Sequence, residues 1–315
     1  MNMNDFFAGQ VFNAYEYFGA HKESGRIVFR TFAPNAANVC IFGSFNNWSE
    51  EPMTQESYGV YSFVSDSADF GDMYKYVIYT KSGERFEHCD PYGFGMELRP
   101  QWASYIVDLS EYKFTDDKWM ECRNKNYNSP MNIYEVHLGS WLNNPQNENG
   151  WYNYSEIADK LIEYAKKHKY THLEFLPLSE HPADCSWGYQ NTGFFSPTSR
   201  YGTAAQLMEL VDKCHKNNIG VIMDFVPVHF AVDGYGLAQY DGSYLYEYPP
   251  SDVGISEWGT CNFNHSRNET RCLVQSAANF WLEKFHFDGL RMDAISRALG
   301  RRSGKRRQRK HCKFP

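Results

Sequence analysis

The chain has 315 residues and a formal net charge of -7, with 17% aromatic and 22% charged residues. This length is sufficient for two domains with sizeable cores. Residues 300–315 hold eight Lys and Arg and no Asp or Glu, so the total of -7 leaves -15 for residues 1–299. An acidic body of this kind argues against nucleic acid as the natural ligand.

The sequence carries no signal for export or for a membrane. A basic segment followed by an apolar run is absent from the first residues, MNMNDFFAGQ, and no stretch is long enough to span a bilayer. The eight cysteines are scattered and form no CxxC pair. We therefore expect free thiols and a cytoplasmic protein.

Short β-rich runs separated by turn residues occupy residues 26–80. They read RIVFRTF (26–32), NVCIFG (38–43), VYSFV (60–64) and YKYVIYT (74–80). This rhythm predicts an N-terminal antiparallel β-sandwich, which we assign to residues 1–125. Trp48 falls at a turn, where its indole is either a packed lid on the sandwich or a platform for sugar, and packing is the favoured interpretation.

The hydrophobic period changes after the polar segment Lys125–Pro130, which we interpret as a linker. Strands are predicted at 131–138, 171–178, 220–227 and 287–295. Two of the intervening helices begin at capping boxes, Asn153 with Glu156 and Thr203 with Gln206; Gly220 is read as the stop of the second, and a third helix covers 269–285.

This unbroken alternation predicts a parallel sheet with right-handed crossovers. About four β/α units make the first half of a β/α TIM-type barrel, assigned to residues 126–299. A doubly wound open sheet is the competing fold, but no Gly-rich phosphate loop follows the first strand.

Polar residues gather where the predicted barrel strands end, which is where such folds place their working residues. Asp224 and His229 belong to the end of the third strand and the loop after it, Arg291 and Asp293 end the fourth, and Tyr189 follows the second. Arg291 and Asp293 are two residues apart in a strand and share a face, so the guanidinium keeps the carboxylate ionised. Each residue alone has a structural explanation, but their shared rim favours a site. Metal-ligand spacing is absent, so we expect no metal.

Two further stretches stand out. Residues 230–258 are too long for a simple connection and predict a binding loop or lid. Residues 300–315, GRRSGKRRQRKHCKFP, lack apolar periodicity and are expected to be disordered. This basic tail is a nuclear-localisation or nucleic-acid patch, a solvated tail on a short protein, or the product of a broken reading frame, and the last alternative is favoured.

Seven stretches carry a resemblance to a known family: YEYFGAH, FRTFAPNAANVCIFGSFNNW, YEVHLGSW, PLSEHPADCSWGYQNTGFFSPTSRYG, GVIMDFVPVHF, GLAQYDGSYLYEY and FDGLRMDAI. In order and spacing they are similar to the 1,4-alpha-glucan (glycogen) branching enzymes of the alpha-amylase superfamily, over residues 1–299. The resemblance implies a starch-binding-type sandwich before a catalytic barrel that stops after its fourth strand. It also implies an α-1,4-glucan partner, no cofactor, and a reaction that cuts the glucan with retention and transfers the fragment to a 6-hydroxyl.

The resemblance also assigns roles. Asp293 matches the nucleophile and Arg291 the arginine that holds it ionised; Tyr189 matches the tyrosine that stacks on the sugar, and Asp224 and His229 match residues that grip its hydroxyls. The family's general acid lies on a fifth strand that is missing here, so we expect no catalysis from this chain alone. The alternatives are a non-catalytic α-glucan-binding fragment and a hydrolase of the same superfamily. The open edges of a half barrel predict poor solubility or oligomerisation, and the oligomeric state itself is not determined.

Overall fold

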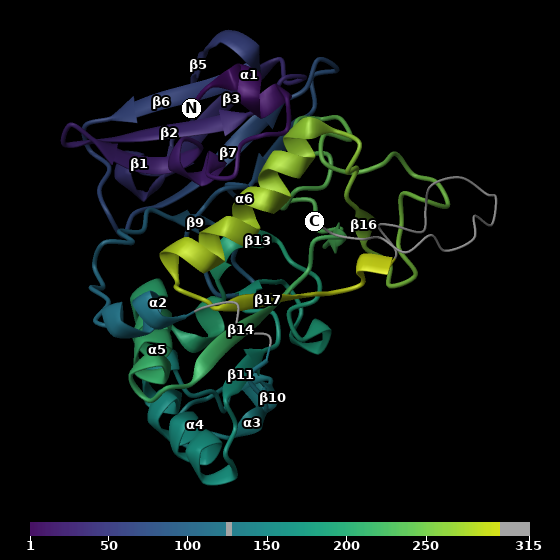
Figure 1. The fold of residues 1–315 in the computed structure, drawn as a ribbon. Coiled ribbons are helices and arrows are strands. Elements are labelled where there is room, and N and C mark those ends of the chain that lie inside the picture. The colour runs from purple at the N-terminus through teal and green to yellow at the C-terminus, as the bar shows by residue number, and fades with distance from the viewer. Residues whose placement is uncertain (124–127, 297–315) are drawn as a thin grey trace.

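The computed structural model describes residues 1–123 and 128–296 (Figure 1). Both predicted parts are present: an antiparallel sandwich and, after it, a sheet of four parallel strands. Within this part of the chain, Cys40, Cys89, Cys185, Cys214, Cys261 and Cys272 are free thiols, and no helix has the length and apolarity needed to cross a membrane. The basic tail at 300–315 and residues 125–127 of the predicted linker lie outside the described residues.

The sandwich consists of two antiparallel sheets. Their strand orders are β1-β2-β6-β5 and β4-β3-β7-β8, with β9 also paired to β7. The predicted runs 26–32 and 38–43 coincide with β2 and β3, because alternate residues such as Ile27 and Phe29 are buried between the sheets. The strands are β1 (Gly19–Glu23), β2 (Arg26–Phe32), β3 (Asn38–Gly43), β4 (Glu51–Pro52), β5 (Thr54–Gln55), β6 (Val60–Ser65), β7 (Met73–Tyr79), β8 (Arg85–His88) and β9 (Ser104–Tyr105).

The second sheet has the strand order β10-β11-β14-β17, and every neighbouring pair is parallel. This order follows the chain without reversal, as in a β/α barrel, whereas a doubly wound sheet reverses direction at a switch point. Its strands are β10 (Ile133–Val136), β11 (His172–Phe175), β14 (Gly220–Phe225) and β17 (Gly289–Met292). Among the described residues β10 and β17 are its outer strands, and association through these edges stays a prediction.

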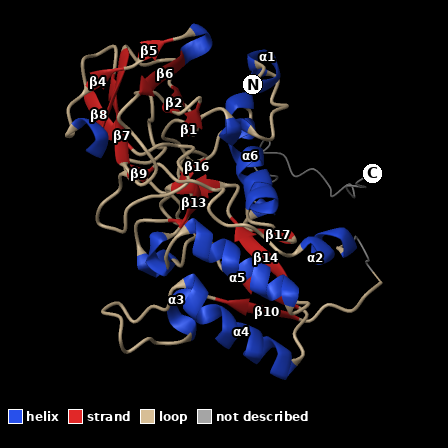
Figure 2. Ribbon diagram, turned by 90° about the vertical axis from the view of Figure 1, so that its left-hand side faces the viewer, coloured by secondary structure: helices blue, strands red, loops and turns tan. Residues whose placement is uncertain are grey.

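Helices α4 and α5 pack along the parallel sheet, whereas α1 lies beside the sandwich (Figure 2). The long ones are α4 (Tyr154–His168), α5 (Ala204–Lys216) and α6 (Asn268–Lys284); the short ones are α1 (Met3–Phe7), α2 (Asp117–Cys122) and α3 (Leu138–Trp141). Both predicted capping boxes are confirmed. Asn153 and Glu156 exchange backbone-to-side-chain hydrogen bonds at the start of α4, and Thr203 and Gln206 do so at the start of α5.

One predicted boundary signal was wrong. Gly220 does not end α5, because that helix stops at Lys216 and Gly220 is the first residue of β14. A Cβ atom at this position would lie 2.4 Å from Cδ2 of His172 on the neighbouring strand. The glycine is thus required by the close approach of β11 and β14 rather than by a helix cap.

Helix α6 lies between the sandwich and the parallel sheet in both views (Figures 1 and 2). On one side, Tyr15 of the 3-10 helix η1 (Ala14–Glu16) donates a hydrogen bond to Glu283 at 2.9 Å. On the other, the buried Trp281 donates from Nε1 to the carbonyl oxygen of Phe194 at 3.1 Å. The helix that leads into β17 therefore also joins the two parts of the molecule.

Candidate active site

The parallel register brings the predicted charged residues to one edge of the sheet. Asp224 of β14 is directly opposite Arg291 of β17. Asp293 follows β17, and its backbone N–H donates to the carbonyl oxygen of Phe225 at 2.9 Å. Because parallel strands end at the same edge, side chains that are far apart in the sequence meet here.

Arg291 lies between two carboxylates. Its Nη1 atom donates to both carboxylate oxygens of Asp224, at 2.9 and 2.8 Å, and to Oδ1 of Asp293 at 2.7 Å. The predicted contact of Arg291 with Asp293 is present, and the contact with Asp224 is additional. One guanidinium thus faces two acidic groups, which leaves one negative charge in excess.

Tyr189 completes this network from the loop after β11. Its hydroxyl donates to Oδ2 of Asp224 at 2.5 Å. Burial raises the pKa of the Asp224 carboxyl above its ordinary value, while the hydrogen bonds from Arg291 and Tyr189 oppose that rise. Burial and the adjacent Asp224 raise the pKa of Tyr189, so its hydroxyl remains a donor at neutral pH.

A cavity of about 360 Å³ opens beside the network, lined by Ser186, Tyr189, Gln190, His229, Trp258 and Asp293. The His229 side chain is buried, and its Nδ1 atom has no hydrogen-bond partner among the described residues. Burial lowers the pKa of His229, and Asp293 opposes the shift, so the ring is neutral at neutral pH. His229 therefore contributes an uncharged side chain to the wall of the cavity.

The five predicted site residues form two groups, according to whether they line the cavity. Tyr189, His229 and Asp293 line it, whereas Asp224 and Arg291 are absent from its lining and contact those that do. The geometry thus gives Asp224 a positioning role toward Tyr189 and Arg291, and its predicted contact with a sugar hydroxyl stays a prediction.

The sequence did not single out three lining residues: Ser186, Gln190 and Trp258. The first two belong to the segment around Tyr189, and Trp258 ends the loop that its length marked as a binding loop. The Trp258 ring centroid is 5.1 Å from that of His229 and its side chain is 46% exposed, so it forms an open aromatic wall. The length of the loop was the signal in the sequence that pointed to this segment, but length does not indicate which residue of the loop faces the cavity.

The sandwich holds this loop in place. Strands β15 (His229–Phe230) and β16 (Cys261–Asn262) pair at its base. Farther out, Tyr240 and Thr31 share a buried hydrogen bond of 2.6 Å between their hydroxyls, and Asp241 accepts from the backbone N–H of Asn35 at 2.9 Å. The ring of Tyr235 stacks on Trp102 at 5.1 Å. Contacts with the sandwich therefore help to position Trp258.

Within this loop, we expect Glu247→Gln to stabilise the protein most above pH 7. Glu247 is 2% exposed, and burial raises the pKa of its carboxyl from 4.5 to about 7. The wild type therefore loses stability as the pH rises from 4.5 through 7, whereas glutamine stays neutral. Between pH 4.5 and pH 8, urea unfolding of both proteins should show their free energies of unfolding diverge by about 2 kcal/mol in favour of the variant. A constant difference over this range would refute the buried carboxylate as the cause.

Two family models match the chain. Carbohydrate-binding module 48 (isoamylase N-terminal domain) matches residues 17–93, and the alpha-amylase catalytic domain matches residues 142–243. The first lies within the sandwich, and the second includes β11, β14 and the loop that carries Tyr189.

Curated relatives extend the similarity beyond these domains. The chain is 46% identical over 306 residues to the 1,4-alpha-glucan branching enzyme GlgB of Fusobacterium nucleatum, covering 95% of this chain and 49% of that protein. It is 46% identical over 309 residues to the enzyme of the same name from Francisella tularensis strain SCHU S4, covering 93% and 47%. The chain thus spans about half the length of the curated relatives it matches.

Solved structures of other proteins have a fold similar to that of this chain. Pullulanase from Paenibacillus barengoltzii, crystallised with maltohexaose and alpha-cyclodextrin, has a TM-score of 0.75 and 20% identity, over 93% of this chain and 50% of that one. A putative alpha amylase from Salmonella typhimurium has a TM-score of 0.71 and 22% identity, over 89% and 44%. At these identities the likeness concerns the fold.

Proposed function

Because this chain is a homologue of the 1,4-alpha-glucan branching enzymes and spans about half of their length, we propose that it carries the nucleophile side of an α-1,4-glucan branching site. In the complete reaction an α-1,4 bond is cut with retention, and the released fragment is passed to a 6-hydroxyl to form an α-1,6 branch. The partner is an α-1,4-glucan. The cytoplasmic location and the lack of a nucleic-acid partner stay predictions.

One observation carries the proposal: Asp293 faces the cavity while its Oδ1 atom accepts a hydrogen bond from Arg291. A carboxylate that attacks a sugar needs an ionised oxygen at the substrate and a fixed orientation. Arg291 supplies both the positive charge and the orientation, and Phe225 fixes the backbone of Asp293. The Tyr189 and Trp258 rings line the same cavity and offer faces on which a pyranose can stack.

Retention by a covalent intermediate also needs a second carboxyl group about 5 to 5.5 Å from the first, to protonate the leaving oxygen. Asp293 is the one carboxylate among the residues that line the cavity, within the described part of the chain. Asp224 is poorly suited to be that acid, because Arg291 and Tyr189 occupy both of its oxygens. The proposal therefore assigns the acid to a residue outside the described ones.

A substrate with a leaving group that needs no acid tests the nucleophile by itself. With an α-maltosyl fluoride that carries a second fluorine at C5 of the reacting ring, a carboxylate oxygen of Asp293 forms a bond to C1. The C1–F bond breaks, and fluoride leaves with the electron pair without protonation. Mass spectrometry should find the glycosyl adduct on the peptide that contains Asp293.

Two variants serve as controls for this labelling. Asp293→Asn should give no adduct, while Asp66→Asn, whose carboxylate is 86% exposed on the sandwich, should label like the wild type. Labelling of another residue, or none in the wild type, would refute the assignment of Asp293. Released reducing sugar from unmodified amylose, without new α-1,6 linkages by NMR, would instead favour a hydrolase.

A second candidate function, α-glucan binding without catalysis, is favoured by an aromatic patch on the sandwich. Trp48 is 41% exposed, although one edge packs against Phe42 at 5.5 Å. The ammonium group of Lys75 lies 5.8 Å from the Trp48 ring centroid and 3.6 Å from that of Trp102. The exposed indole of Trp48 beside a donor suits a sugar. Retention on an amylose column without labelling of Asp293 would support this function over the first.

A further inference from the structure

A buried histidine lies between two aspartates at the end of β17 that is opposite to Asp293. The side chain of His215 in α5 is 0% exposed; its Nδ1 atom is 2.7 Å from Oδ2 of Asp116, and its Nε2 atom is 3.0 Å from Oδ2 of Asp288. We propose that His215 is a doubly protonated imidazolium and a positioning residue, which holds Asp288 and strand β17 in the register that presents Asp293 to the cavity. Only the consequence for Asp293 rests on the proposed function.

The hydrogen bonds of His215 require two protons on its ring. A carboxylate only accepts hydrogen bonds, and a neutral imidazole has one N–H, so the other nitrogen of a neutral ring would point its lone pair at an aspartate oxygen. An imidazolium donates from both nitrogens and satisfies both aspartates. Among the described residues no group of His, Cys, Asp and Glu has the arrangement of a metal site, so a proton is the cation that fits between these side chains.

The other partners of Asp288 keep its carboxyl group ionised. Its Oδ1 atom accepts from Nε1 of Trp119 at 2.8 Å, and its Oδ2 atom accepts from the backbone N–H of Val221 at 2.8 Å. Burial raises the pKa of Asp288, but the hydrogen bonds and charge of His215, together with the bonds from Trp119 and Val221, outweigh burial and lower that pKa below its ordinary value. The proton therefore belongs to His215 rather than to Asp288.

The surroundings also favour a cation at this position. Trp119 of α2 stacks on the ring of His215, with centroids 5.0 Å apart and planes at 13°, and the face of an indole attracts positive charge. The other titratable groups near the two aspartates are His286, which donates to Asp116 at 2.9 Å, Arg123, 3.7 Å from Asp288, and His172 and Cys214, which interact with Asp288 through its charge. Burial keeps His172 and Cys214 uncharged, so Arg123 and a protonated His215 balance the two carboxylates.

Asp288 fixes how β17 pairs with β14. Its backbone N–H donates to the carbonyl oxygen of Val221 at 2.9 Å, while its side chain accepts from the backbone N–H of the same residue. Both backbone polar groups of Val221 are thus bound by one residue, in the register that sets Asp224 opposite Arg291. A slip by one residue would turn every side chain of β17 to the other face of the sheet. Asp293 lies at the far end of this strand, roughly 17 Å away at about 3.3 Å per residue, and still depends on this contact.

Nitrogen-15 NMR on the chain with labelled histidine rings tests the charge of His215. At pH 8 histidines with an ordinary pKa of about 6.5 are neutral, and a neutral ring gives two widely separated nitrogen signals, whereas an imidazolium gives two nearly equal ones. We expect the signals that disappear in His215→Gln to be those of an imidazolium. In Asp116→Asn the amide can donate to Nδ1 of His215, so the ring should be neutral. A neutral His215 ring in the wild type would overturn the inference.

The positioning role is tested by the labelling of Asp293 with the maltosyl fluoride. His215→Gln should slow labelling about 10- to 100-fold, because a misplacement of about 1 Å can cost 100-fold in rate. It should also speed hydrogen exchange of the Asp293 backbone N–H, which donates to Phe225. Asp116→Asn should label faster than His215→Gln, since a neutral ring still donates from Nε2 to Asp288.

Ile41→Ala is the matched control, because it leaves a cavity in the core of the sandwich, where Ile41 of β3 is 0% exposed, and destabilises the protein without touching β17. It should label at the wild-type rate, and circular dichroism checks that each variant folds. A wild-type rate in His215→Gln, or equal slowing in Ile41→Ala, would refute the positioning role.

Hydrogen exchange separates this inference from the proposed function. If the wild-type chain gives no adduct, the assignment of Asp293 as nucleophile fails, and exchange of the Asp293 N–H decides the inference by itself. Faster exchange in His215→Gln but not in Ile41→Ala would then support the register contact, and equal exchange in the two variants would overturn it.

Discussion

Arg200→Met is expected to lower the free energy of unfolding by about 3 to 5 kcal/mol, the range for removing one partner of a buried ion pair. The Arg200 side chain is 1% exposed and that of Glu180 is 4% exposed. Arg200 Nη1 donates to Oε1 of Glu180 at 2.7 Å and to the carbonyl oxygen of His181 at 2.8 Å. Without the guanidinium, the buried Glu180 carboxylate loses its countercharge and the His181 carbonyl loses a donor, although Ser199 still donates to Glu180.

The effect should also reach the candidate active site. Glu180 belongs to β12 (Ser179–Glu180), which pairs with β13, and the loop between these strands carries Tyr189. Loss of the ion pair loosens the base of that loop, so labelling of Asp293 by the maltosyl fluoride should slow in the same variant.

Urea unfolding at pH 7 measures the change in stability. Arg85→Met is the matched control, because Arg85 pairs with Glu50 at a surface where the side chains are 40% and 30% exposed. Exposed pairs contribute about 1 kcal/mol or less. In addition, Arg200→Met combined with Glu180→Gln should recover part of the loss, since the amide oxygen still accepts from Ser199 and no buried carboxylate is left without its cation. Equal costs for Arg200→Met and Arg85→Met would contradict the assignment of a buried pair.

Arg291→Met is expected to slow the labelling of Asp293 by about 100-fold, because a hydrogen bond to a charged group contributes about 1.5 to 3 kcal/mol. The substitution removes the donor to Oδ1 of Asp293 and leaves Asp224 beside it without its cation. Asp293 then loses its orientation, and the two carboxylates repel each other across the site.

Pseudo-first-order rates of adduct formation, followed by intact-mass spectrometry, measure this effect. Arg291→Lys keeps the charge but lacks the planar fork, so its rate should lie between those of the wild type and Arg291→Met. Arg291→Met combined with Asp224→Asn removes the repulsion and should recover part of the rate. A wild-type rate in Arg291→Met would show that Asp293 needs neither the charge nor the contact.

Local patterns in the sequence predicted the elements well where one short segment contains all the information. The β-rich runs at 26–32 and 38–43, bounded by turn residues, gave the limits of β2 and β3, and Asn153 with Glu156 marked the start of α4. A capping box involves residues only three positions apart, so no distant contact is needed to form it. Gly220 was misread because its reason lies on another strand, at His172.

The candidate site likewise combines features that the local sequence predicted with contacts that depend on distant segments. Tyr189, His229 and Asp293 were chosen by their position after strands, and they line one cavity. The second contact of Arg291, with Asp224, depends on the register between β14 and β17, which no local pattern encodes. The position of Trp258 depends on contacts between distant segments, such as the hydrogen bond from Gln190 to its carbonyl oxygen and that of Tyr240 with Thr31 in the same loop.

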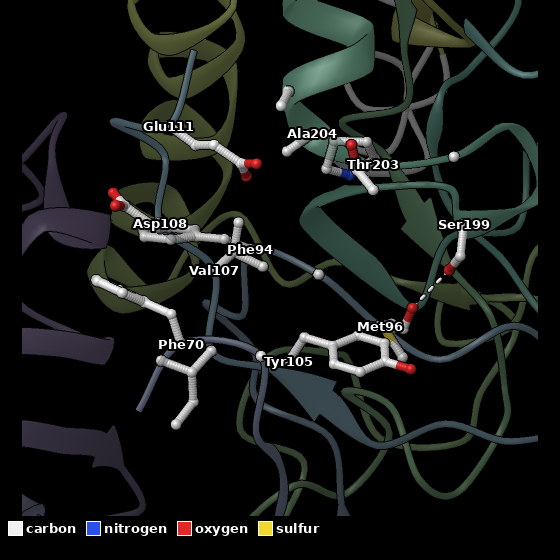
Figure 3. A pocket seen from close by; sticks show the side chains of 16 residues that line it. Phe70, Phe94, Met96, Tyr105, Val107, Asp108, Glu111, Ser199, Thr203 and Ala204 are labelled. Atoms are coloured by element: carbon white, nitrogen blue, oxygen red, sulfur yellow. Dashed lines mark hydrogen bonds between the residues drawn. The ribbon is translucent and has the colours of Figure 1, made fainter. Parts of the chain in front are cut away.

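The sequence by itself determined the order of the two parts, the strands and helices within them, and the rim at which the reactive residues gather, since these depend on hydrophobic period and on the parallel direction of the strands. The tertiary structure decided how Arg291 divides its contact between two acids, which aromatic ring closes the cavity, and that a further cavity exists at the junction of the sandwich and the sheet. A cavity of about 580 Å³ at this junction is lined by residues of 70–111 and of 197–205, which are distant in the sequence and meet only in the folded chain (Figure 3).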